Sequence, residues 1–251
     1  MRQLSDRVLL RGGNAPRTPP VELRAGHLNM LFEPDTAFLR YVRAGDEEIV
    51  RGMYVAVRDH NWGTVEPLLS DLDIYVREDA FDIHFVADCR QGDIHFVWRG
   101  AITGSSHAVV QFSMDGEAHS RFQRSRIGFC VLHPMSVAGR ACSVEHVDGS
   151  LTHGEFPSRV SPHQPFMDIR AISYELPDGG SVDVRMDGDT FEMEDQRNWT
   201  DASYKTYCTP LALPFPVTLD AGDHVRQSVT TTAMRGASGS SRPIRRSVDA
   251  V

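Results

Sequence analysis

Apolar and polar residues alternate with a period of two over much of the chain, and this pattern predicts β-strands. The clearest run is 81–89, in which Phe81, Ile83, Phe85, Ala87 and Cys89 all fall on one face. Comparable runs occupy residues 49–57, 94–102, 109–114, 127–134, 142–147, 167–174 and 182–186. Strands therefore dominate the expected secondary structure.

Asp-Gly pairs separate many of these runs and predict tight turns, because glycine adopts positive φ without strain. They stand at 115–116, 148–149, 178–179 and 187–188. The last strands are expected within 218–229, and the best helix candidate is the short segment 64–72. About a dozen strands without a periodic repeat favour an all-β fold, a large antiparallel β-sandwich.

The two ends differ from the middle of the chain. Residues 14–20 are rich in proline and polar side chains, and residues 233–251 combine Gly and Ser with four arginines and almost no large apolar residue. Such a tail cannot offset its ordering entropy by burial. We therefore predict an N-terminal arm over 1–20, a β-sandwich domain over 21–232 and a disordered tail over 233–251.

Composition narrows the classes of function. The 251 residues include 26 Lys plus Arg and 34 Asp plus Glu, a net charge of −8, which argues against a nucleic-acid partner. No run approaches the roughly 18 apolar residues that cross a bilayer, and the N-terminal residues show no apolar signal segment. We therefore predict a cytoplasmic protein without a membrane partner, whose four scattered cysteines are reduced thiols.

Polar chemistry concentrates in two segments. Residues 133–163 carry four of the eleven histidines, and residues 191–207 are dense in carboxylates, amides, aromatics and cations. The second segment has no hydrophobic period of 2 or 3.6. A long irregular polar segment inside a β domain is typical of a binding loop.

This mixture suits a polyhydroxylated ligand, because carboxylates and amides pair with hydroxyl groups and Trp199 can stack on a sugar face. For acyl hydrolysis, Glu194 or Asp195 is the candidate general base, and His163 or Arg197 the candidate donor to the oxyanion. The predicted substrate-binding residues are His133, His153, Asn198, Trp199, Asp201 and Lys205. The alternative is that these groups form a buried salt-bridge network that holds an irregular loop.

Other chemistries have weaker support. His146, His153 and His163 with a carboxylate would make a zinc site, but spacings of 7 and 10 match no compact ligand motif and HExxH is absent. Gly-x-Ser-x-Gly does not occur. We therefore predict no metal and no cofactor.

Residues 191–207 (FEMEDQRNWTDASYKTY), followed by Pro210-Leu211 and 214–216 (PFP), resemble the N-terminal region of bacterial D-apionate lactonases. Segments 154–157 (GEFP) and 161–166 (SPHQPF) resemble the same family, and the likeness extends over residues 20–232. The resemblance implies a carboxylic ester hydrolase that opens the lactone of D-apionate in apiose catabolism. It also implies a TIM-barrel domain after the β domain, which is expected to be missing here.

The fold is also similar to the galactose-mutarotase-like supersandwich, whose members bind sugars on a concave sheet. The leading hypothesis is a lactonase acting on a sugar-acid lactone, with water activated by Glu194 or Asp195 and the carbonyl polarised by His163 and Arg197. The alternatives are a non-catalytic carbohydrate-binding or interaction domain and a mutarotase-like epimerase. A homo-oligomer, or a barrel domain as partner, stays open.

Overall fold

The computed structural model describes residues 18–236. This part of the chain forms seventeen strands and two short 3-10 helices, η1 and η2. Their bounds are β1 Val21–Ala25, β2 Leu28–Glu33, β3 Phe38–Ala44, β4 Glu47–Asp59, β5 Pro67–Val76, β6 Phe81–Gln91, β7 Ile94–Ser105, β8 Val109–Ala118, β9 Phe122–Pro134, η1 Met135–Val137, β10 Ala141–His146, β11 Leu151–Glu155, β12 Ile169–Glu175, β13 Ser181–Asp187, β14 Glu192–Asp195, η2 Gln196–Trp199, β15 Ser203–Tyr207, β16 Val217–Leu219 and β17 His224–Met234.

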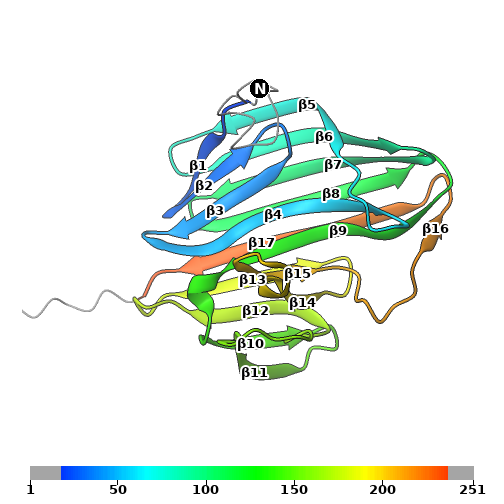
Figure 1. Ribbon diagram of the computed structural model, residues 1–251. Helices are drawn as coiled ribbons and strands as arrows, with labels where there is room; N and C mark the ends of the chain where they lie inside the picture. The colour runs from blue at the N-terminus through cyan, green and yellow to red at the C-terminus, as the bar shows by residue number, and fades with distance from the viewer. Residues whose placement is uncertain (1–17, 237–251) are drawn as a thin grey trace, which may run out of the picture.

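The strands form two antiparallel sheets that pack face to face (Figure 1). Sheet I has the order β1-β2-β3-β4-β9-β15-β14, and β16 also pairs with β9. Sheet II has the order β11-β10-β12-β13-β17-β8-β7-β6-β5. The predicted all-β antiparallel sandwich is therefore confirmed. The central strands β4 and β9 are the longest of sheet I, and they carry much of the cavity described below.

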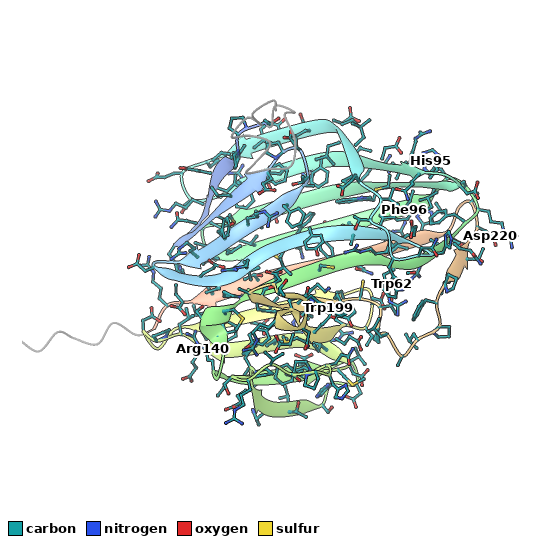
Figure 2. The ribbon with its side chains drawn as sticks, in the orientation of Figure 1. Trp62, His95, Phe96, Arg140, Trp199 and Asp220 are labelled. Carbon is teal, nitrogen blue, oxygen red and sulfur yellow. The ribbon has the colours of Figure 1, made fainter. Side chains whose placement is uncertain are left out.

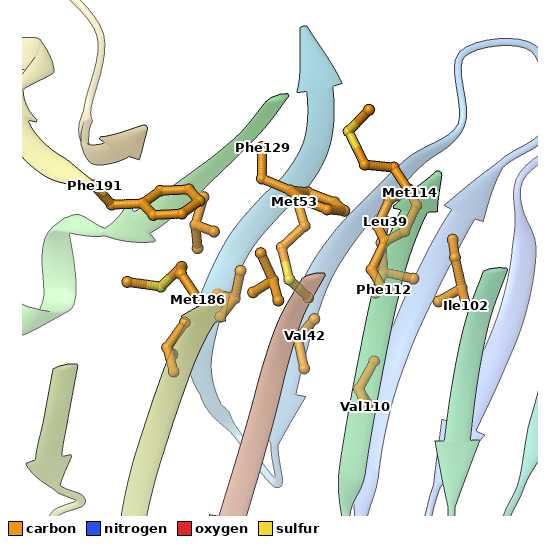
Figure 3. Packing of buried hydrophobic residues seen from close by; sticks show 14 of the residues in the cluster. Leu39, Val42, Met53, Ile102, Val110, Phe112, Met114, Phe129, Met186 and Phe191 are labelled. Carbon is orange, nitrogen blue, oxygen red and sulfur yellow. The ribbon is translucent and has the colours of Figure 1, made fainter. Parts of the chain in front are cut away.

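The core lies between the two sheets and follows the predicted alternation. Phe81, Ile83 and Phe85 of β6 are all buried, as the period of two requires. Phe112 of β8 and Phe129 of β9 join sheet II to sheet I, with ring centroids 4.9 Å apart (Figure 3). Burying one such side chain stabilises the fold by roughly 1.5–3 kcal/mol.

The helix expected over 64–72 is wrong, because the segment enters the edge strand β5. Leu69, Leu72 and Ile74 face inward, and the register of β5 against β6 shifts between Ser70 and Asp73. This bulge inserts an extra residue between Leu69 and Leu72. The resulting spacing of three imitates a helical period in the sequence.

Of the predicted turns, those at 148–149 and 178–179 connect β10 to β11 and β12 to β13, as expected. The turn predicted at Asp115-Gly116 is wrong, because both residues lie inside β8. Gly116 pairs with Trp98 of β7, and a Cβ at this position would overlap the Phe96 ring. The glycine therefore makes room for an aromatic ring and not for a turn.

The first described strand, β1, begins at Val21, and the last, β17, ends at Met234. The domain bounds given above stay a prediction. Residues 1–17 and 237–251 lie outside the described part, so the arm and the tail stay predictions. Neither helix in the described part is long or apolar enough to cross a membrane. The four cysteines are free and buried.

Candidate functional site

A cavity of about 660 Å³ opens on the outer face of sheet I, the face turned away from sheet II. Strands β4, β9, β14 and β15 supply most of its walls, and the segments after β4 and β15 complete them. The lining residues are Ala56, Arg58, Trp62, Arg126, Gly128, Cys130, Glu194, Gln196, Trp199, Lys205, Tyr207, Cys208 and Leu211.

Small side chains form the floor of this cavity. Ala56 of β4 pairs with Gly128 of β9, and Cys130 lies two residues further along the same face. Gly128 has φ +148°, and a Cβ there would overlap Cys208 and Gln227. The hollow therefore depends on residues that fill little space on two neighbouring central strands.

One wall is a polar cluster centred on Glu194. Lys205 is its partner across β14 and β15, and the Lys205 Nζ lies 3.0 Å from Glu194 Oε2. Trp199 Nε1 donates to Oε1 at 2.6 Å, and Gln196 Nε2 donates to Oε2 at 2.8 Å. The carboxylate is held in a fixed orientation, while 22% of its side chain stays exposed to the cavity.

A second carboxylate, Glu192, lies behind Tyr207 in the same wall. The Tyr207 hydroxyl donates to Glu192 Oε1 at 2.6 Å, and the Leu211 backbone N–H donates to the same oxygen at 2.8 Å. Burial and the Glu192 carboxylate raise the pKa of Tyr207 well above its usual value. Tyr207 is therefore neutral at physiological pH, and its hydroxyl is engaged by Glu192 while its side chain lines the cavity.

Two tryptophans stand at the mouth of the cavity. Trp199 ends η2 and is 69% exposed, and Trp62 follows β4 and is 38% exposed. Both are labelled in Figure 2. Single exposed aromatic side chains are common on protein surfaces, so the informative feature is that both indoles line one cavity. Two indole rings beside charged groups are well suited to the apolar face of a sugar ring.

Asp195 and Arg197, predicted as base and donor, do not line this cavity. They form an ion pair with each other: Arg197 Nη2 lies 2.7 Å from Asp195 Oδ2, and Arg197 Nε donates to Oδ1 at 2.9 Å. Asp195 is fully buried and also accepts from the Ser161 N–H, while Arg197 donates to the carbonyl oxygens of residues 157–159. This pair is the buried network that the sequence offered as the alternative.

The charge of Asp195 is well supported. Burial alone raises the pKa of its carboxyl, but the hydrogen bonds from the Arg197 side chain and from the Ser161 and Arg197 N–H groups outweigh burial. The net pKa therefore lies below the usual value. Asp195 is a structural anion that fastens the segment 157–161, and the catalytic role predicted for it is corrected on this geometry.

Four further residues of the predicted site also lie outside the cavity lining. His163 is exposed in the segment before β12, so the donor role predicted for it beside Glu194 is not supported. Asn198 donates to the Ser161 carbonyl oxygen at 2.6 Å. Asp201 is exposed beyond η2, and His153 is exposed on the edge strand β11 of sheet II.

His133 was predicted to contact substrate, but it is fully buried in β9. Its Nε2 lies 2.9 Å from Thr206 Oγ1, and its ring packs near Phe156. Burial lowers the pKa of His133 to about 4, so the imidazole is neutral at pH 7. It is a core residue, and the prediction that it binds substrate is wrong.

The histidines considered as zinc ligands have separate partners. His146 contacts the Met167 carbonyl oxygen and the Thr152 hydroxyl, and His153 contacts Ser143. Within residues 18–236, no three His, Cys, Asp or Glu side chains are grouped as a metal site requires.

Comparison with known proteins now identifies the family. The model of the D-apionate lactonase N-terminal domain matches residues 8–236. The chain belongs to this family. The D-apionate lactonase of Brucella anthropi is 38% identical over 226 residues, which cover 89% of this chain and 37% of that protein. The chain thus spans little more than a third of the length of this curated relative.

Solved structures share the fold of this lactonase N-terminal domain. A putative aldose 1-epimerase from Escherichia coli K12 aligns with a TM-score of 0.53 and 8% identity over 86% of this chain and 99% of its own. Galactose 1-epimerase from Lactobacillus acidophilus NCFM aligns with a TM-score of 0.51 and 7% identity over 90% and 97%. At these identities the likeness concerns the fold alone, and it confirms the galactose-mutarotase-like sandwich.

The site of this family member is only partly visible in its sequence. Glu194, Trp199 and Lys205 were predicted and do line the cavity. Trp62 and Arg126 also line the cavity, and neither is among the predicted substrate-binding residues. Trp62 and Arg126 come together because β4 pairs with β9, a strand that lies far from β4 in the sequence.

Proposed function

We propose that this domain of a lactonase-family protein binds a sugar-acid ligand, as lactone or as open acid, in the cavity on sheet I. The observation that carries the proposal is a cavity of about 660 Å³ whose lining combines Trp62 and Trp199 with the charged groups of Glu194 and Lys205. Its volume is within the range of small-molecule sites. Membership of the D-apionate lactonase family supports D-apionate and its lactone as the ligands to test.

The polar groups of the cavity match a hydroxylated ring. Glu194 accepts hydrogen bonds and Lys205 donates them, and the 3.0 Å contact between them fixes both side chains before a ligand arrives. A ligand that stacks on Trp199 can replace water at both groups without large side-chain rearrangement. Such preorganisation limits the entropy lost on binding.

Lactone hydrolysis is the second candidate, favoured by the position of Glu194 in the cavity. The carboxylate would accept a proton from water while the water oxygen bonds to the lactone carbonyl carbon. The ring C–O bond then breaks, and its oxygen takes up a proton to become a hydroxyl group. We rank ligand binding above hydrolysis because Gln196, Trp199 and Lys205 already donate to the Glu194 carboxylate, which makes it a weaker base toward water.

The test combines calorimetric titration with D-apionolactone and D-apionate and acid release at constant pH. We expect binding that Glu194→Gln weakens and that Glu155→Gln, on the exposed edge strand β11, leaves unchanged. Acid release above the buffer rate that disappears in Glu194→Gln would establish hydrolysis. Absence of binding to either compound would refute the proposal, and mutarotation of a free sugar would favour the epimerase.

A further inference from the structure

One end of the cavity carries two arginines that face each other and that form no direct ion pair with a carboxylate of the described residues. Arg58 of β4 and Arg126 of β9 are direct partners across the two strands, and both line the cavity. Like charges at directly opposed positions of an antiparallel pair are destabilising. A sequence that keeps both at the edge of a cavity therefore needs a compensating interaction.

Arg126 is 4% exposed, and its hydrogen bonds leave part of the guanidinium available. Nε, Nη1 and Nη2 donate to the carbonyl oxygens of Thr209, Ser125 and Pro210 at 2.5, 2.7 and 2.9 Å. A guanidinium has five N–H donors, so two remain, one on each terminal nitrogen. Terminal N–H groups of arginine are strong donors to carboxylates, and these two are not used by the three carbonyl contacts.

Aromatic rings partly compensate this charge but do not neutralise it. The Arg126 Cζ lies 5.2 Å from the centroid of a Trp62 ring and 5.0 Å from that of Phe215. No carboxylate of the described chain lies within ion-pair distance of Arg126. Burial, together with the charge of Arg124, lowers the pKa of Arg126, and the more distant Glu192 carboxylate offsets this only in part.

The neighbouring arginines are equally without anions. Arg58 donates to the Trp62 carbonyl oxygen at 3.3 Å and to the Thr64 hydroxyl, both neutral groups. Arg124, two residues before Arg126 on the same face, has a buried Nε without any hydrogen-bond partner in the described chain. Most other arginines of residues 18–236, such as Arg140, do contact a carboxylate.

The charge of the cavity follows from these contacts. Glu194 balances Lys205 within the wall, and the Glu192 carboxylate behind Tyr207 acts on Arg126, so Arg58 and Arg126 leave one net positive charge on a chain whose net charge is −8. Four residues along β9 separate Arg126 from Cys130, about 13 Å of strand. The cavity thus has a cationic end and an aromatic, hydroxyl-binding end, far enough apart for a small sugar acid.

We infer that the Arg58–Arg126 end binds a carboxylate, so that the cavity prefers an open sugar acid to its neutral lactone or to a neutral sugar. The carboxylate docks on the free N–H groups of Arg126 beside Arg58, and the hydroxylated carbons extend over the floor toward Trp199. This inference rests on the proposed function, because it names which form of the ligand the same site selects.

Calorimetric titration of the chain with D-apionate, D-apionolactone and neutral D-apiose tests this preference. We expect D-apionate to bind at least about tenfold more tightly than either neutral compound in low salt, with the advantage reduced in 0.5 M NaCl. Equal affinities for acid and lactone would overturn the inference but leave the proposed function standing. Binding of none of the three would overturn both.

Single-residue variants test whether this preference for D-apionate depends on the two arginines. Arg58→Gln should reduce the preference for D-apionate to within about threefold and change lactone affinity little, because only the acid uses the charge. Arg226→Gln, which removes an exposed arginine of β17 in sheet II, is the matched control and should keep the full preference. Arg126→Gln, at the other arginine of the pair, serves as a second variant if Arg58→Gln does not fold. An undiminished preference in a folded variant at either position would contradict the assignment.

Discussion

Two neighbouring carboxylates of β14 lie in different environments. Glu194 faces the cavity, contacts Lys205 and Trp199, and keeps 22% of its side chain exposed. Asp195 points to the other side of the strand, is fully buried and is paired with Arg197. The density of polar residues in the sequence made both of them site candidates. They lie on opposite sides of β14 because successive side chains of a strand point to opposite faces.

The buried Asp195–Arg197 pair nonetheless helps to position a residue that lines the cavity. Asp195 caps η2 by accepting from the Arg197 N–H at 3.1 Å, and η2 ends at Trp199. Arg197 ties the same turn to the carbonyl oxygens of the segment before β12. The Asp195–Arg197 pair therefore fixes the position from which Trp199 reaches the mouth of the cavity.

The sharpest test of this contrast is the removal of the buried anion. Asp195→Ala leaves the Arg197 guanidinium without its counter-charge and should lower the free energy of unfolding by about 3–5 kcal/mol. Asp201→Ala, an exposed aspartate just past η2, should change it by less than about 1 kcal/mol. Urea denaturation measures both, and equal losses in the two variants would show that Asp195 does not stabilise the fold in this way.

The pH dependence of stability provides the next test. His133 has its pKa lowered to about 4, whereas an unfolded histidine takes up a proton near pH 6.5. Between these values only the unfolded chain binds the proton, so the free energy of unfolding falls by about 3 kcal/mol as the pH drops from 6.5 to 4.

His133→Gln should remove this part of the pH dependence, as urea denaturation at pH 7 and pH 4.5 would show. Asp195 does not interfere in this window. Its carboxyl has a lowered pKa, so its contribution is lost only as the pH falls below the usual aspartate value of 3.8. An unchanged slope in His133→Gln would contradict the buried neutral imidazole.

Substitutions of residues that line the cavity should affect ligand binding and not folding. Trp199→Ala should weaken the binding of D-apionate roughly tenfold, or about 1.4 kcal/mol, by removing the stacking surface. Its unfolding free energy should change by no more than about 0.5 kcal/mol, because the indole is largely exposed. Tyr75→Ala, an exposed aromatic on the edge strand β5, is the control. Comparable loss of affinity in both would argue against stacking at Trp199.

Local patterns sufficed for the fold class and for many strands, since alternation reports burial directly. They failed where the local signal had two causes: the bulge in β5 imitates a helical spacing, and Gly116 accommodates a ring where a turn was expected. The family likeness was visible because the polar segment 191–207 is long and specific, and the match over residues 8–236 confirms it.

The site was predictable only in part, for a physical reason. Glu194, Trp199 and Lys205 lie within one short stretch of sequence, which local reasoning can find. Arg58 and Arg126 meet only through the pairing of β4 with β9, and an alternation rule cannot identify the partner of a strand. Asp195 and Arg197 are only two residues apart, so their pairing was open for another reason: composition allowed either a binding site or a buried network, and it does not show which side of β14 is buried.

A crystal structure of the chain with D-apionate tests the central claim most directly. The account predicts the ligand on sheet I between Trp62 and Trp199, with its carboxylate within hydrogen-bond distance of Arg126 and its hydroxyl groups near Glu194 and Lys205. A ligand bound to the outer face of sheet II, or beside His163 and away from this cavity, would contradict it.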